Sequence, residues 1–119
     1  MDAAELAEVE ALIKSVSFYR NKAKALKDMA RRVNSGEWDG DIPNTLAGLK
    51  DLKGVGPKIA ALALQTAWGT EAADVSIGVD VHLHNVSNRL GWVDDGISDD
   101  AARRQLESWL PIELWAEVS

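Results

Sequence analysis

The stretch Leu52–Ala60 reads LKGVGPKIA. Gly54 and Gly56 bracket one valine, Pro57 follows them, and Lys58 comes next. Because glycine tolerates positive φ and close backbone approach, we expect a tight turn between two helices that leaves backbone N–H groups unpaired. Proline suits the first position of the next helix, where a missing N–H costs nothing. Free amides and the positive end of the helix dipole together predict an anion site.

The glycine pattern alone does not separate an anion site from a plain turn, because many helix–helix turns contain glycine. The spacing of a nucleotide-binding P-loop, G-x-x-x-x-G-K-[ST], is absent. Lys58 adds a second signal, since a cation is disfavoured in the first turn of a helix and apolar residues follow it. Both effects favour the uncharged amine, which forms Schiff bases with carbonyl carbon. A surface lysine beside a turn is an equal alternative.

A partner for the lysine stands downstream in IGVDVHLHNVSNRL, residues 77–90. Asp80 heads a predicted helix, where it can serve as N-cap. It can also serve as a carboxylate that accepts a proton or stabilises positive charge near the lysine, and the two roles are compatible. His82 and His84 are two residues apart and face different sides of a helix, which disfavours a metal pair. We expect His82 to make a structural hydrogen bond.

Composition bounds the class of protein. The chain has 119 residues, 46% of them hydrophobic and 27% charged, which suits one globular domain. A net charge of −6 by itself argues against nucleic-acid binding. Seven basic residues nevertheless fall between Ala11 and Arg32 against one acid, Asp28, and a solvated helix face is the favoured interpretation of that run. No apolar run is long enough to span a membrane, so we expect no membrane partner.

Periodicity predicts an all-α chain with short connections and a single helical domain over residues 1–119. Helices are expected over residues 4–33 with a break near Ser15–Ser17, from 44 or 45 to 52 with Asn44 as cap, 57–68, 80–90, and 99–110 with Ser98 as cap. Residues 73–79 are a weak strand candidate. The five tryptophans are expected to pack in the core, with the role of Trp38 left open.

Three stretches in order, LKGVGPKIA, AWGT and GVDVHLH, resemble the helix-hairpin-helix DNA glycosylases with a Gly/Pro-rich loop and a trailing aspartate. The branch that the chain resembles is endonuclease III in its eukaryotic form, with support from SVSFYRNKAKAL, GDIPNTLAGL and LESWLPIELWAEV. The resemblance covers Ser15–Val118. It implies a partial helix-hairpin-helix glycosylase fold, an incomplete six-helix barrel with its hairpin at residues 52–58.

The resemblance also implies a reaction. The family excises oxidised pyrimidines from double-stranded DNA and cleaves the strand at the resulting abasic site, acting on a base turned out of the duplex. By the motif match, Lys58 would attack C1′ and form a Schiff base, and Asp80 would deprotonate it or stabilise the sugar cation. The implied DNA-binding residues are Lys53, Gly54, Val55 and Gly56. The eukaryotic branch implies the nucleus, and the mitochondrion as a second compartment.

Several departures from the family pattern limit the resemblance. Lys53 stands where the family has proline, Asn85 stands where relatives have arginine, and the loop Thr70–Val79 is longer. The sequence contains no cysteine, so the family's [4Fe–4S] cluster has no ligand here and we expect no cofactor or metal. The chain also resembles a fragment truncated at both ends. The alternatives to an enzyme are a catalytically inactive fragment and a non-catalytic helix-hairpin-helix DNA-binding module.

Overall fold

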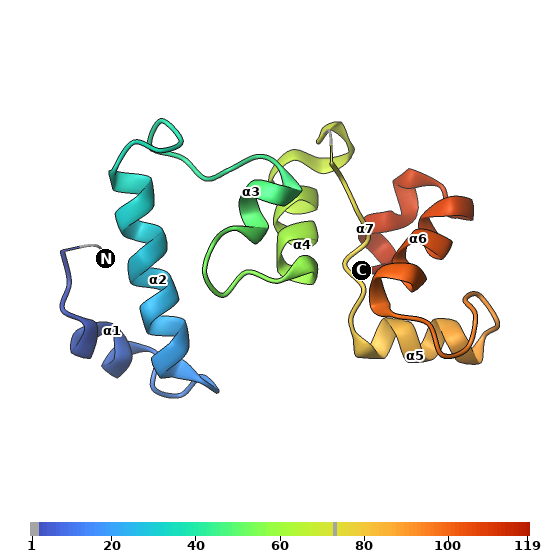
Figure 1. Ribbon diagram of the computed structural model, residues 1–119, viewed down its shortest axis with the longest axis horizontal. Coiled ribbons are helices and arrows are strands. Elements are labelled where there is room, and N and C mark those ends of the chain that lie inside the picture. The colour runs from blue at the N-terminus through green and yellow to red at the C-terminus, as the bar shows by residue number, and fades with distance from the viewer. Residues whose placement is uncertain (1–2, 73) are drawn as a thin grey trace. The chain divides into compact units, whose positions relative to one another are not determined.

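The computed structural model describes residues 3–72 and 74–119. Within those ranges the chain is helical and has no strand, which confirms the all-α prediction. The elements are α1 Leu6–Leu12, α2 Tyr19–Asn34, α3 Leu46–Lys50, α4 Pro57–Trp68, the 3₁₀ turn η1 Gly69–Glu71, α5 Val81–Arg89, α6 Asp99–Trp109, η2 Ile112–Leu114 and α7 Trp115–Val118 (Figure 1). None of the described helices is long and apolar enough to cross a membrane.

The chain divides into two compact units. Unit 1 holds Met1–Pro43 with Asp51–Gly54, and unit 2 holds Asn44–Lys50 with Val55–Ser119. The first part of the hairpin loop therefore belongs to one unit and the second part to the other. The single domain over residues 1–119 stays a prediction.

In unit 1, α1 packs against α2 after a sharp break in the chain. Phe18, the N-cap of α2, has φ 58 in the left-handed region, which is unusual for an aromatic residue and prevents one continuous helix. The predicted break near Ser15–Ser17 is confirmed. Much of the basic run is exposed, as expected for a solvated face: Lys14, Arg20, Lys22, Lys24 and Arg31.

Arg32 departs from that solvated pattern because it joins α2 to the residues before the hairpin. Its Nη2 donates to Asp51 Oδ2 at 2.8 Å and to Glu37 Oε1 at 2.6 Å. Its guanidinium lies over the Trp38 ring, 4.7 Å from the centroid. Hydrogen bonds to Glu37 and then to Asp51 raise the pKa of Arg32. Trp38 therefore has a structural role within unit 1.

The core of unit 2 forms around an extended segment rather than around helices alone. Ile77, 1% exposed, clusters with Val93, Ala102 and Leu106. Partly buried side chains pack around this cluster: Val79, Leu83, Ile97, Leu110, Trp115 and Val118. We name the segment Ser76–Val79 the strap, because it runs from the described residues after η1 to the start of α5 without secondary structure of its own.

The helix caps follow the sequence with one correction. Asp80 caps α5 and Ser98 caps α6, each accepting a backbone N–H, as predicted. At α3 the cap is Thr45, whose Oγ1 accepts from Gly48 N at 3.1 Å, so the assignment to Asn44 is wrong. That helix is also shorter than predicted. Ala73 of the proposed strand lies outside the described residues, and residues 74–79 form no strand.

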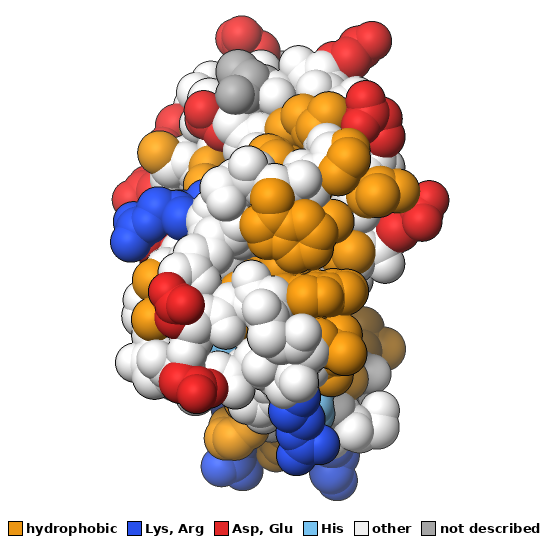
Figure 2. Space-filling view, turned by 90° about the vertical axis from the view of Figure 1, so that its right-hand side faces the viewer, with side chains coloured by type: hydrophobic (Ala, Val, Ile, Leu, Met, Phe, Trp, Pro, Cys, Tyr) orange, Lys and Arg blue, Asp and Glu red, His pale blue; other side chains and the backbone are white. Residues whose placement is uncertain are grey.

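Unit 2 exposes apolar surface over α5, α6 and the C-terminal segments. Trp92 and Trp109 are 42% and 49% exposed and pack edge to face, with ring centroids 5.6 Å apart. Figure 2 shows apolar side chains gathered on the side of the molecule that carries these elements. The prediction of core packing is therefore wrong for these two tryptophans. Trp115 does pack against the core, and its Nε1 donates to Leu110 O at 3.0 Å.

Candidate active site

The two glycines of the hairpin differ in conformation. Gly54 has φ +83, and a Cβ added there would lie 3.0 Å from Ala25 Cβ within unit 1. Gly56 is the N-cap of α4 with extended φ −90, and a Cβ there would meet nothing within 4 Å. The expected need for positive φ and close approach is confirmed for Gly54 and wrong for Gly56.

The N-terminus of α4 begins as the sequence predicts, with Pro57 at its first position. Gly56 O accepts the N–H of Ala60 at 3.0 Å, while the Val55 and Gly56 N–H groups make no backbone hydrogen bond among the described residues. Such amides at the positive end of a helix can bind an anion. Lys53 is exposed, and after Arg31 and Arg32 its charge contributes to the lowered pKa of Asp28 within unit 1.

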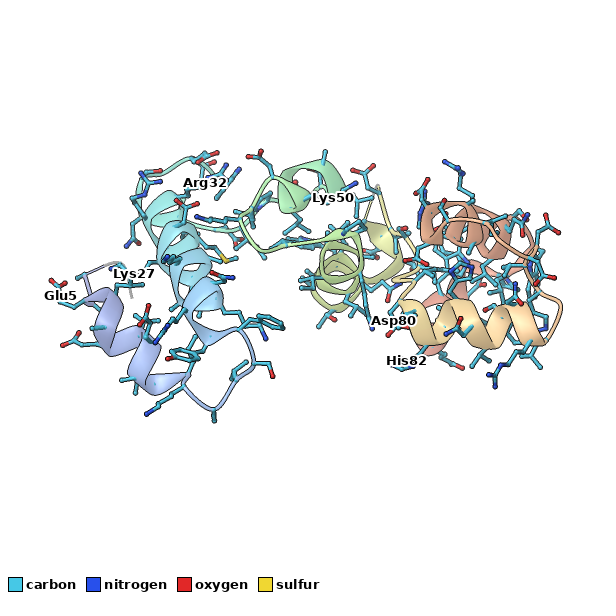
Figure 3. The ribbon with its side chains drawn as sticks, turned by 60° about the horizontal axis from the view of Figure 1, so that its bottom comes forward. Glu5, Lys27, Arg32, Lys50, Asp80 and His82 are labelled. Carbon is cyan, nitrogen blue, oxygen red and sulfur yellow. The ribbon has the colours of Figure 1, made fainter. Side chains whose placement is uncertain are left out.

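The structure brings Lys58 and Asp80 together. Lys58 Nζ donates to Asp80 Oδ2 at 2.5 Å, from the first turn of α4 to the N-cap of α5. The other oxygen, Oδ1, accepts the Leu83 N–H at 2.8 Å. The Leu83 hydrogen bond and then Lys58 lower the pKa of Asp80 to about 2, so the group is a carboxylate at neutral pH. Figure 3 shows Asp80 at the start of α5.

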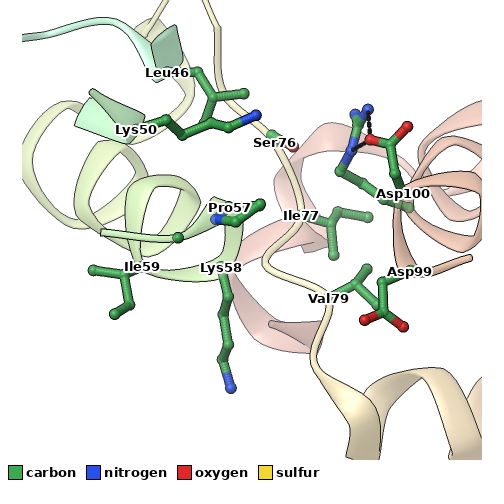
Figure 4. A pocket seen from close by; sticks show the side chains of 12 residues that line it. Leu46, Lys50, Pro57, Lys58, Ile59, Ser76, Ile77, Val79, Asp99 and Asp100 are labelled. Atoms are coloured by element: carbon green, nitrogen blue, oxygen red, sulfur yellow. Dashed lines mark hydrogen bonds and ion pairs between the residues drawn. The ribbon is translucent and has the colours of Figure 1, made fainter. Parts of the chain in front are cut away.

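Lys58 lines a cavity of about 550 Å³ within unit 2. The apolar lining comes from Leu46, Pro57, Ile59, Ile77 and Val79, and the charged lining from Lys50, Asp99, Asp100 and Arg103 (Figure 4). In Figure 4 the Lys58 and Lys50 side chains extend in different directions. The Lys58 side chain is 39% exposed and ion-paired, so the apolar surroundings expected from the sequence are not what its amine meets.

Sequence reasoning missed the residues that hold the strap. Glu107 on α6 binds Ser76 and Ile77. Gln65 on α4 binds Ser76, and Ser119 binds Gly78. They lie 11 to 41 positions from their partners in the chain. No spacing rule or motif links side chains at such separations, so no signal in this sequence identifies them.

The side-chain hydrogen bond expected of His82 is made by His84 instead. His84 Nδ1 lies 2.6 Å from Asp99 Oδ1 and joins α5 to α6. His82 is exposed and makes no hydrogen bond among the described residues, so the predicted hydrogen-bonding role for His82 is wrong. No cluster of three or more potential metal-ligating side chains occurs in the described part of the chain. An iron–sulfur cluster needs cysteine thiolates, which this sequence cannot supply.

Comparison with known proteins identifies the family. Residues 1–112 match the sequence model of the HhH-GPD superfamily of base excision DNA repair proteins. The chain belongs to this superfamily. The resemblance to endonuclease III and the partial helix-hairpin-helix glycosylase fold are both confirmed.

Curated members of the superfamily include several similar proteins from eukaryotes. Endonuclease III-like protein 1 of Bos taurus is 46% identical over 92% of this chain and 35% of its own length. The endonuclease III homolog of Schizosaccharomyces pombe is 44% identical over 91% and 29%. The chloroplastic endonuclease III homolog 2 of Arabidopsis thaliana is 41% identical over 100% and 31%. The chain thus spans about a third of the length of these relatives.

Two solved endonuclease III–DNA structures share the fold. A trapped covalent intermediate has a TM-score of 0.87 and 31% identity, covering 98% of this chain and 53% of that chain. A non-covalent complex has a TM-score of 0.88 and 32% identity, covering 98% and 52%. The order of helices and the hairpin of this HhH-GPD chain therefore match proteins that bind DNA in those structures.

Proposed function

We propose that the chain acts in base excision DNA repair, as a DNA glycosylase for oxidised pyrimidines that also cleaves abasic sites through a Schiff base on Lys58. The observation that carries the proposal is the 2.5 Å contact between Lys58 Nζ and Asp80 Oδ2 at the N-terminus of α4. Superfamily membership supports the reaction class, and the likeness to a trapped endonuclease III–DNA covalent intermediate supports a covalent step.

The proposed chemistry begins when the Lys58 ammonium loses a proton to solvent. Its amine then attacks C1′ and forms an N–C bond. On a damaged nucleotide the C1′–base bond breaks and the base takes up the proton that the amine loses; the C1′–O4′ bond then opens, O4′ takes a proton from solvent, and the iminium forms. On an abasic aldehyde the carbonyl oxygen leaves as water. The resulting iminium acidifies the C2′ proton, whose loss breaks the bond between C3′ and the phosphate oxygen. Because its pKa is about 2, Asp80 is a weak base. We therefore assign it to stabilising positive charge on the sugar and the lysine.

The proposed DNA contact is a backbone phosphate at the hairpin amides of Gly54, Val55 and Gly56, with added charge from Lys53. Two observations support it: the Val55 and Gly56 N–H groups make no backbone hydrogen bond in the described residues, and they adjoin the N-terminus of α4. Backbone amides bind phosphate without raising net charge, which fits a chain of charge −6. The proposed partner is double-stranded DNA with a damaged base or abasic site, in the nucleus or mitochondrion.

Borohydride trapping tests the proposal. A duplex with one abasic site is incubated with the chain and borohydride, which reduces the imine to a stable amine link. We expect a covalent protein–DNA band that disappears in Lys58→Ala. Lys50→Ala is the matched control, because Lys50 lines the same cavity but extends in another direction, and we expect it to retain the band. No band from folded, unmodified protein would refute the lyase proposal.

A second candidate function is a non-catalytic DNA-binding module, favoured by hairpin amides that are free while Lys58 is ion-paired. It predicts salt-sensitive duplex binding that Lys58→Gln leaves unchanged and Gly54→Val abolishes. Duplex binding without trapping would favour this module. Folded protein with neither property would favour an inactive chain.

A further inference from the structure

The strap has buried backbone groups that no helix or strand among the described residues pairs. Ser76 is 4% exposed and Ile77 is 1% exposed. Buried N–H and C=O groups need partners. One pair lies within the strap, where Val79 N donates to Ile77 O at 3.1 Å. Side chains bind Ser76 O, Ile77 N and Gly78 N. The identity of those side chains therefore decides where the strap lies.

Glu107 is the principal partner. Its Oε1 accepts two hydrogen bonds, from Ser76 Oγ at 2.8 Å and from Ile77 N at 2.9 Å. Its Oε2 accepts from Arg103 Nη1 at 2.7 Å, which orients the carboxylate from one helical turn earlier on α6. The Glu107 side chain is 16% exposed. Charge-assisted hydrogen bonds in such a setting are stronger than neutral ones, so this residue fixes the strap more firmly than a hydroxyl or amide.

Two weaker anchors complete the set. Gln65 Nε2 donates to Ser76 O at 2.6 Å, and Gly78 N donates to Ser119 Oγ at 3.1 Å. Each of these partners is neutral. Glu107 is therefore the single charged group that holds the strap among the described residues.

The strap in turn contacts the first turn of α4. A Cβ added to Gly78 would lie 3.4 Å from the Lys58 backbone oxygen and 3.5 Å from Lys58 Cγ. Asp80 follows two residues later as the N-cap of α5. A displacement of the strap by even a few tenths of an ångström would therefore change the distance and angle of the hydrogen bond between Lys58 Nζ and Asp80 Oδ2.

We propose that Glu107 is a positioning residue for the Lys58–Asp80 pair. Its hydrogen bonds to Ser76 and Ile77 set the distance between Lys58 Nζ and Asp80 Oδ2. Among the described residues, Glu107 makes hydrogen bonds and ion pairs with Ser76, Ile77 and Arg103 and with neither Lys58 nor Asp80, so its influence passes through the strap. The catalytic consequence rests on the proposed function, whereas the geometric part does not.

Three variants separate positioning from general stability. Glu107→Leu removes the acceptor, while Glu107→Gln keeps an oxygen that can accept from Ser76 and Ile77. Gln105→Leu is the matched control on the same helix: Gln105 clamps a different loop, accepting from Asp94 N at 2.9 Å and donating to Asp94 Oδ2 at 2.6 Å. All measurements are made under conditions where each variant is folded.

The first readout needs no DNA. We expect Glu107→Leu to speed amide hydrogen exchange at Ile77 and to raise the pKa of Asp80 from about 2 towards 3.8, measured by carboxyl carbon-13 NMR. Part of the depression should persist, because the Leu83 N–H still binds Asp80. Gln105→Leu should change neither quantity, and Glu107→Gln should fall between. Unchanged values in Glu107→Leu would overturn the proposal even if the chain showed no activity.

The second readout is the trapping rate at saturating abasic duplex. We expect Glu107→Leu to lower it at least about tenfold, since misplacing a reacting group by about 1 Å can cost a hundredfold. Glu107→Gln should restore most of the rate. In an Asp80→Asn background Glu107→Leu should add little further loss, because both act on one contact. Equal losses in both backgrounds would show a merely structural role. Failure of the unmodified chain to trap would instead refute the proposed function.

Discussion

The hairpin loop positions Lys58 and the strap positions Asp80, and the two segments do so by different interactions. The position of Lys58 follows from residues adjacent to it in the sequence: the glycine N-cap, the proline at the first helical position and the start of α4. The strap reaches Asp80 through hydrogen bonds to Gln65, Glu107 and Ser119, which come from distant parts of the chain. One segment is shaped by its own backbone preferences and the other by its neighbours in space.

The comparison shows why the lysine is easy to find and the geometry of its partner is not. Backbone preferences act within a few residues and leave a readable pattern. Side-chain hydrogen bonds to buried backbone groups act across the tertiary structure, and a polar residue from any part of the chain can supply them if the fold places it nearby. Substitutions in the two segments should therefore differ in size and in kind.

The largest expected effect on stability is in the hairpin. Gly54→Ala should lower the free energy of unfolding by about 2 kcal/mol, because alanine at φ +83 is strained and its Cβ would lie 3.0 Å from Ala25 Cβ. Gly56→Ala is the matched control. Its φ is extended and its surroundings are open. Alanine is a poorer N-cap than glycine but restricts the unfolded chain more, and because these effects oppose each other the net change should stay within about 0.5 kcal/mol. Urea unfolding of both variants measures the difference, and equal losses would contradict this account of the loop.

A smaller effect is expected in the strap. Gly78→Ala should cost about 1 kcal/mol, because the added methyl would lie 3.4 Å from the Lys58 backbone oxygen and from Leu62 Cγ, tighter than usual packing. Gly78→Ala should also slow borohydride trapping more than Gly54→Ala does for an equal loss of stability. The reason is that Gly78 lies in the strap, so the added methyl displaces the segment that positions Asp80. Urea unfolding and trapping rates on the same samples provide the test. Trapping that simply follows stability in both variants would remove the distinction between the segments.

The smallest effect is a pH dependence from Asp80. Its pKa is about 2 in the folded chain against 3.8 ordinarily, so the unfolded state binds more protons between these values. The stabilising contribution is therefore fully present above about pH 4 and is lost as the pH falls towards 2. Asp80→Asn keeps a good N-cap but removes the charge, and should flatten this part of the stability curve. Urea midpoints at several acidic pH values measure the slope; an unchanged slope would mean that the Lys58 and Leu83 contacts do not stabilise the carboxylate.

Much of the secondary structure could be predicted because its signals are local. The break before Phe18, the helix Pro57–Trp68, and the caps at Asp80 and Ser98 all follow from residues close together in the chain. The sequence-based predictions were wrong where two similar residues lie close together and tertiary contacts determine which one is used. The cap of α3 is Thr45 in place of Asn44, and the hydrogen-bonded histidine is His84 in place of His82. The exposed Trp92 and Trp109 could not be predicted either, because periodicity shows which residues share a face but not whether that face is covered.

The sequence by itself determined the helical class, the family, and the order of glycine hairpin, lysine and aspartate, because these depend on residue types at short spacing. It placed Lys58 at the start of a helix and Asp80 at the head of another. Only the tertiary structure decided that the amine and carboxylate meet at 2.5 Å, and that Glu107 holds the strap between them. The physical reason is range: backbone preferences act within one turn, whereas the charged contacts of this site join residues far apart in the chain.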